Sequence, residues 1–166
     1  MMLQQIKSDL TAAQKEKNEA KVSTLRMLSS ALTYKGVNKR TLIAGKEPNL
    51  SEQELAQKSE LTEQEIIDVI FSEAKKRKEA ALEYERGNRP ELAQKEKAEL
   101  EILSVYLPAQ MGEEEIRKLV ADAIAKTGAK DGKDMGKVMG ALVPLTKGKA
   151  DGTLVSKIVK ELLSGK

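Results

Sequence analysis

The fold is decided by residues 62–90, which read TEQEIIDVIFSEAKKRKEAALEYERGNRP. Thr62 and Glu65 have the spacing of a capping box, in which the hydroxyl accepts a backbone N–H and the glutamate returns a hydrogen bond to the cap. The apolar residues after them recur every three or four positions, as on one face of an α-helix. Gly87 and Pro90 then predict a helix end followed by the first turn of a new helix.

Helical spacing of apolar residues extends through nearly the whole chain. Asn18 is placed to cap a long helix that ends near Gly45, and Ser51 begins a second capping box before a short helical segment. No stretch alternates apolar and polar residues, so we expect an all-α protein. The side chains expected on inner faces of the N-terminal helices include Leu3, Ile6, Leu10, Ala13, Val22, Leu25, Leu28, Leu32, Val37, Leu92, Leu100, Leu103 and Val105.

The composition changes at residues 108–112, and six of the eleven glycines fall within residues 128–152. We therefore expect an N-terminal domain of long antiparallel helices over 1–107 and a small C-terminal three-helix domain over 108–166. The three helices of the second domain are expected to begin at Glu113, near Asp134 and after Asp151, with the second ending before Pro144.

Gly136 and Gly140 lie one helical turn apart, which predicts a face where a neighbouring helix approaches closely. The segment from Gly132 to Lys137 superficially resembles a phosphate-binding loop. It is one residue too short for that motif, and Val138 stands where a hydroxyl should bind magnesium. Helix packing is therefore the preferred interpretation of these glycines.

The chain contains no cysteine, histidine or tryptophan. The absence of cysteine and histidine excludes disulfides, thiolate metal sites and the Ser-His-Asp triad. No nucleophile stands beside a base, so we assign no catalytic residue, metal ligand or cofactor. The polar residues at 4–5 interrupt any signal peptide, and no apolar stretch is long enough for a membrane span, so a cytoplasmic location without membrane contact is expected.

Residues 108–166 hold eleven Lys and Arg against eight Asp and Glu, whereas residues 1–107 hold eighteen of each. Exposed lysines that share a face can contact the phosphates of a nucleic acid, although a solvated surface shows the same composition. The run at 75–78 is predicted to be solvated and paired with nearby glutamates. The candidate nucleic-acid-binding residues are Lys130, Lys133, Lys137, Lys147, Lys149, Lys157 and Lys160, with Arg86 and Arg89 as a basic corner beside Gly87.

Residues 134–144 (DMGKVMGALVP) and 147–155 (KGKADGTLV) closely resemble the YqeY-like family. The C-terminal domain of that family is similar to the tail of GatB, a component of the aspartyl/glutamyl-tRNA amidotransferase. Residues 86–89, 106–110 and 113–115 agree with the resemblance. Two departures are Gly112, in place of a serine-like cap, and a stretch at 46–58 that is long enough for an extra short helix.

The resemblance implies an all-helical protein in two parts, linked to tRNA-dependent amidation with glutamine as the amide donor. It implies carbon–nitrogen ligase activity, but no counterpart of a ligase active site is visible in this chain. We therefore expect a tRNA-binding accessory protein whose partners are tRNA and an amidotransferase or a tRNA synthetase. The alternative is a protein-interaction module that docks through Gly136 and Gly140.

Overall fold

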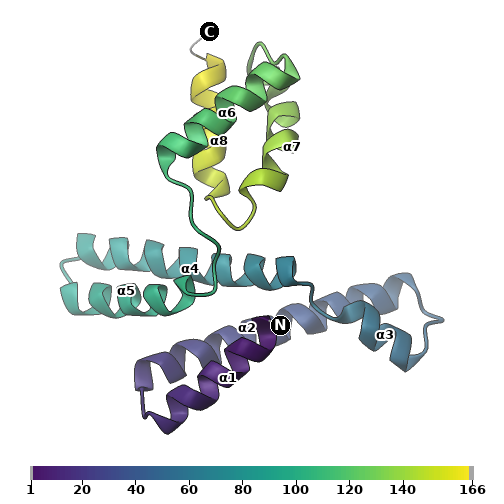
Figure 1. The fold of residues 1–166 in the computed structure, drawn as a ribbon, viewed down its shortest axis with the longest axis vertical. Helices are drawn as coiled ribbons and strands as arrows, with labels where there is room; N and C mark the ends of the chain where they lie inside the picture. Colours follow the sequence, from purple (N-terminus) through teal and green to yellow (C-terminus); the bar gives the residue numbers. More distant parts are fainter. Residues whose placement is uncertain (1, 165–166) are drawn as a thin grey trace. The chain divides into compact units, whose positions relative to one another are not determined.

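The computed structural model describes residues 2–164 and confirms an all-α fold, with no strand among those residues. The chain divides into two compact units, Met1–Tyr106 and Leu107–Lys166. The first unit holds helices α1 to α5, and the second holds helices α6 to α8 with a short 3₁₀ turn, η1 (Figure 1). Within the described residues, no helix has the length and apolar character needed to cross a bilayer.

Two helices, α1 (Met2–Lys15) and α2 (Glu19–Lys46), form a hairpin at the start of the N-terminal unit. Lys17 takes the left-handed φ of 56° within the turn between them. The Asn18 side chain accepts the Lys21 N–H at 3.0 Å, which confirms the predicted helix cap. With 28 residues, α2 is about 42 Å long and is the longest helix of the described chain.

The next two helices, α3 (Glu52–Ser59) and α4 (Glu63–Arg86), both begin with the predicted capping box. In α4 the Thr62 hydroxyl accepts the Glu65 N–H at 3.2 Å, and the Glu65 carboxylate accepts the Thr62 N–H at 2.8 Å. The same carboxylate accepts a hydrogen bond from Lys39 Nζ of α2 at 2.7 Å. The bond from Lys39, followed by those from Thr62, holds the pKa of Glu65 below its usual value. The cap therefore also fastens α4 to α2.

The helix α5 (Pro90–Ser104) returns antiparallel to α4 after a tight turn (Figure 1). Gly87 ends α4 as predicted, with a φ of −78°. Asn88 takes the left-handed conformation of the turn, with a φ of 54°. Asparagine tolerates this region because its short polar side chain bonds locally. A Cβ at Gly87 would lie 3.3 Å from the Glu83 carbonyl oxygen, a tight contact.

Small side chains separate α4 from α5. Ala74 and Ala81 of α4 and Ala93 of α5 are buried, and they allow the two helix backbones to come close. Leu92 and Val105, expected inside, are exposed, by 40% and 73%. Leu92 is in the first turn of α5, and Val105 follows its last residue, so both lie at the ends of the helix.

The inward face of α2 also differs from the expectation at one position. Leu25, Leu28 and Leu32 are buried as expected, but Val37 is 55% exposed. Val37 lies five positions after Leu32, which turns it about 140° round the helix from the buried leucines. Lys39 lies on the inward side instead and reaches Glu65 of α4.

Arg77 of α4 lies against two glutamates of α5. Its Nε is 3.0 Å from Oε2 of Glu99, and its Nη1 is 3.6 Å from Oε2 of Glu96. These side chains are 16%, 9% and 15% exposed, so three charges share a poorly solvated contact. The predicted solvated face at 75–78 is therefore wrong for Arg77, although Lys76 does pair with Glu73 at 2.6 Å on the surface.

Replacing Arg77 by methionine should lower the free energy of unfolding by about 3 kcal/mol, because two carboxylates would remain largely buried without their cation. Denaturant titration measures the change. The matched control is Lys76→Met, which removes a 63% exposed ammonium group from its pair with Glu73 and should cost roughly 0–1 kcal/mol. Adding Glu99→Met to Arg77→Met should recover part of the loss. Equal effects of Arg77→Met and Lys76→Met would contradict a structural role for the buried cluster.

The C-terminal unit contains α6 (Glu113–Thr127), η1 (Gly132–Asp134), α7 (Met135–Thr146) and α8 (Gly152–Ser164). Gly112 caps α6 without a side-chain hydrogen bond, as its missing hydroxyl predicts. The unit has its own buried core, which consists of Ile116, Val120, Ala123, Ile124, Ala129, Val138, Leu142, Ala150, Val155, Ile158, Val159 and Leu163.

Pro144 lies inside α7, which continues to Thr146 instead of ending before the proline. A proline has no N–H to donate to the carbonyl four residues earlier, and its ring crowds that carbonyl. The residue four positions earlier is Gly140, and nothing lies within 4 Å of where its Cβ would be. The open surroundings of Gly140 allow the helix to adjust around Pro144.

Tyr106 is the last residue of the N-terminal unit. Its ring is buried, and its O–H donates to Oδ2 of Asp9 on α1 at 2.6 Å. Burial of the phenol, followed by the hydrogen bond to Asp9, raises the pKa of Tyr106 well above its ordinary value of 10. The last residue of the unit is thereby tied to its first helix.

Replacing Tyr106 by phenylalanine should lower the free energy of unfolding by about 1.5 kcal/mol at neutral pH, since Asp9 loses its charge-assisted hydrogen bond. Because the folded pKa is raised, the stabilisation is complete below pH 10 and falls as the pH rises above it. Denaturant titrations from neutral pH to above pH 10 should show the wild-type advantage shrinking. Tyr34→Phe, at an exposed phenol, serves as control, and a wild-type advantage independent of pH would contradict the assignment.

Candidate nucleic-acid interface

The loop between α7 and α8 carries Lys147 and Lys149 on a fixed backbone. Gly148 is in the left-handed region with a φ of 75°, and its carbonyl accepts from the Gln110 side-chain amide at 3.0 Å. The Lys149 carbonyl accepts the Met111 N–H at 2.8 Å. Both lysine side chains are exposed. The loop therefore holds two cations in place without enclosing them.

The connection before α7 places Lys130 and Lys133 beside two aspartates. Asp131 accepts the Lys133 N–H at 2.8 Å, and Asp134 accepts the Lys130 N–H at 2.9 Å. These carboxylates thus bind backbone amides, and the two lysine side chains are exposed. Neither ammonium group forms an ion pair with another described residue.

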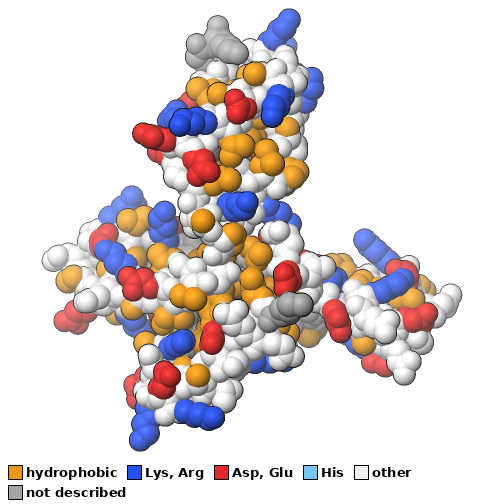
Figure 2. Space-filling model, in the orientation of Figure 1, with side chains coloured by type: hydrophobic (Ala, Val, Ile, Leu, Met, Phe, Trp, Pro, Cys, Tyr) orange, Lys and Arg blue, Asp and Glu red, His pale blue; other side chains and the backbone are white. Residues whose placement is uncertain are grey.

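These lysines do not form a single cluster. Lys130, Lys133 and Lys137 lie at the beginning of α7, whereas Lys147 and Lys149 follow its end. The ten residues from Lys137 to Lys147 correspond to about 15 Å along a helix. In Figure 2 the blue side chains of the C-terminal unit stand at separate places, with other surface between them. A ligand that contacts both groups must be extended.

The two candidates on α8 differ in their surroundings. Lys157 and Lys160 are both exposed and three positions apart, so they lie on neighbouring parts of the helix surface. Lys157 Nζ is 3.9 Å from Glu161, whose carboxylate also accepts a hydrogen bond from Arg117 of α6 at 3.0 Å. The carboxylate offsets the charge of Lys157, and Lys160 has no such partner among the described residues.

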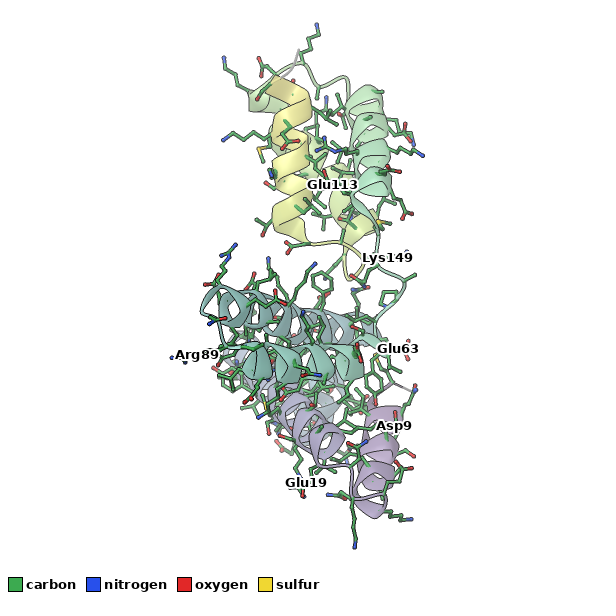
Figure 3. The ribbon with its side chains drawn as sticks, turned by 90° about the vertical axis from the view of Figure 1, so that its left-hand side faces the viewer. Asp9, Glu19, Glu63, Arg89, Glu113 and Lys149 are labelled. Atoms are coloured by element: carbon green, nitrogen blue, oxygen red, sulfur yellow. The ribbon has the colours of Figure 1, made fainter. Side chains whose placement is uncertain are left out.

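Arg86 and Arg89 belong to the other unit, at the turn between α4 and α5, where Figure 3 labels Arg89. Both are exposed. Arg86 Nη1 lies 2.7 Å from Glu83 in a surface ion pair, which reduces its availability to an anion. The two arginines therefore form a basic corner at this turn of the N-terminal unit.

The expected helix contact at Gly136 and Gly140 is absent from the described residues. Both glycines are exposed, and a Cβ at either would meet nothing within 4 Å. The core of the unit forms on the opposite face, through Val138 and Leu142. Val143, on the same side as Gly136, is about half exposed. This side of α7 is therefore low in profile and partly apolar, with exposed Lys137 next to Gly136 in the sequence.

Sequence reasoning overlooked a charge separation inside the N-terminal unit. Residues 1–46 hold nine Lys and Arg against three Asp and Glu, and residues 47–107 hold nine against fifteen. The positive net charge of residues 1–46 and the negative net charge of residues 47–107 cancel. The net charge of residues 1–107 as a whole therefore does not show either of them. Counting charge helix by helix would have revealed them. No group of acidic side chains in the described part of the chain is arranged to bind a metal ion.

The fold and surface define a class: an all-helical protein of two units, with exposed cations on both and no assembled catalytic group among the described residues. The family model for Yqey-like protein matches residues 3–163. The chain belongs to the YqeY-like family.

A relative in the fungus Pyrenophora tritici-repentis (strain Pt-1C-BFP) is described as "Altered inheritance of mitochondria protein 41, mitochondrial". It is 28% identical over 171 residues, which cover 100% of this chain and 83% of the relative. The name places that protein in mitochondria. The expected cytoplasmic location of the present chain stays a prediction.

Proposed function

We propose that this protein binds tRNA as an accessory factor of tRNA-dependent amidation. The observation that carries the proposal is the set of exposed lysines on the C-terminal unit that lack ion pairs with described residues. These are Lys130, Lys133, Lys137, Lys149 and Lys160.

Physical chemistry favours a polyanion as the ligand of such a surface. Lysines on both sides of α7, about 15 Å apart, suit a phosphate backbone that extends past one small anion. Phosphate contacts of this kind position an RNA without reading its sequence. The resemblance to the GatB tail supports tRNA as the RNA. Carbon–nitrogen ligation would then belong to an amidotransferase or tRNA synthetase partner, because no nucleophile and base meet in the described residues.

Changing Lys133, Lys137, Lys147 and Lys149 together to glutamate should weaken tRNA binding by at least about 100-fold, because attraction to phosphate becomes repulsion. Fluorescence anisotropy with labelled tRNA at several salt concentrations measures this. For wild type, log affinity should fall linearly with log salt.

A control with the same charge change replaces Lys118 and Lys126 of α6 together with Lys78 and Lys95 of the N-terminal unit by glutamate. All four are exposed. The control should bind more tightly than the first variant. Equal losses in both variants would show a general charge effect, and unchanged binding in the first would reject the proposed function.

A protein-interaction module remains the second candidate, and the open face of α7 favours it. Two exposed glycines one turn apart, beside half-exposed Val143, let another helix approach closely. The partner considered is an amidotransferase or a tRNA synthetase.

Gly140→Leu tests the docking candidate, since the new side chain meets no atom of its own chain near its Cβ but blocks close approach from outside. The free energy of unfolding should stay equal or rise by up to about 1 kcal/mol, because a helical glycine is replaced. Nuclease-resistant co-purification of the amidotransferase or synthetase should be lost. The control is Ala125→Leu, at an exposed position of α6. Retained co-purification in Gly140→Leu would exclude docking through this face.

A further inference from the structure

The helix α2 contains an uninterrupted stretch without acidic residues. From Ala20 to Lys46 there are 27 residues with six Lys and Arg and no Asp or Glu. The whole chain has 26 acidic residues in 166, so a stretch of this length would carry about four. All 27 positions lie within α2, over about 40 Å. This segment of α2 is therefore positively charged along its whole length, although the net charge of the N-terminal unit is zero.

Only part of this charge is used inside the protein. Lys39 pairs with Glu65 of α4 at 2.7 Å, and Arg40 pairs with Glu52 of α3. Arg26, Lys35 and Lys46 are exposed and form no ion pair within residues 2–164. The acidic residues of α3 to α5 thus neutralise two cations of α2 and leave the others for an external anion.

The solvent-facing side of α2 is uncharged along its centre. Ser30, Tyr34, Val37 and Thr41 follow one another at spacings of three and four, and all are exposed. Tyr34 is 70% exposed, although it is one of only four aromatic residues in the chain. By helical position, Arg26 lies at one edge of this strip. Lys35 and Lys46 lie about 130° and 150° further round the helix from the centre of the strip and are exposed there.

The chemistry of this surface suits RNA better than lipid or another helix. A membrane-binding helix needs a continuous apolar face, and here the apolar part of the strip is limited to Tyr34 and Val37, with Ser30 and Thr41 at its ends and exposed Leu42 on another side of the helix. A docking helix needs the same kind of seam. Cations spaced along and around α2 suit the phosphates of an RNA backbone, and an exposed tyrosine offers a stacking surface for an unpaired base.

We propose that the exposed surface of α2 is a second RNA-binding surface, in which an RNA that passes around the helix contacts Arg26, Lys35 and Lys46 through its phosphates and Tyr34 through a base or ribose. The proposal takes from the proposed function only that the ligand is RNA. The residues that would bind it belong to the N-terminal unit and do not include the lysines of the C-terminal unit.

The test uses the full chain with Arg26, Lys35 and Lys46 all changed to glutamine, and labelled tRNA as the probe. Affinity at ~100 mM salt should fall at least about tenfold, and the slope of log affinity against log salt should decrease by about 2, as expected for three lost phosphate contacts. The control changes Lys78, Lys95 and Lys97, which are exposed on the acidic half of the same unit, to glutamine. It should bind within about twofold of wild type. Equal affinities of the two variants would overturn the proposal.

Two further measurements separate the alternatives. Acetylation of wild-type lysines with and without tRNA should show protection of Lys35 and Lys46 but not of Lys78 and Lys95, and this result does not depend on the variant's folding. Vesicles of phosphatidylcholine and phosphatidylglycerol should not compete with tRNA for the wild-type protein. Competition by the vesicles, or unprotected Lys35 and Lys46, would overturn the proposal. Loss of binding in the C-terminal lysine variant alone would support the proposed function and reject the α2 surface.

Discussion

The close contact between α4 and α5 is the interaction on which the N-terminal unit depends. Alanines bring the two helices together, and Arg77 then meets Glu96 and Glu99 with little water around them. This contact fixes which side of α5 faces inward, while Leu92 and Val105, at the two ends of the helix, stay exposed. Three poorly solvated charges pair well in only a few geometries. The cluster therefore specifies the register of α4 against α5 and also stabilises their contact.

The C-terminal unit is organised differently. Its three helices enclose an apolar core, and the polar residues around that core are used to fix loops. Asp131 and Asp134 bind backbone amides, while Gln110 and the Met111 N–H hold the loop after α7. Because these groups bind the backbone, the lysines beside them project from rigid positions. An anion that binds these lysines would break few ion pairs within the unit.

Charge in this protein is sorted by helix, and this sorting connects the fold with the proposed RNA binding. In the N-terminal unit the acidic helices neutralise Lys39 and Arg40 of α2 and thereby fasten it. The same pairs orient the remaining cations and Tyr34 toward solvent. The residues that hold α2 in place and those proposed to bind RNA are therefore neighbours on one helix with separate tasks.

The sequence alone determined the all-α class, both capping boxes and the inner residues of the tail helices, because these follow from spacing within a single helix. Family membership was also visible in residues 134–155. Only the tertiary structure decided that Leu92 lies outside, that Arg77 is drawn between α4 and α5, and that no helix of the described chain covers Gly136 and Gly140. Each of these depends on which helices meet. A periodic pattern shows that a helix has an inner face, but the partner, which comes from a distant part of the chain, decides which residues that face contains.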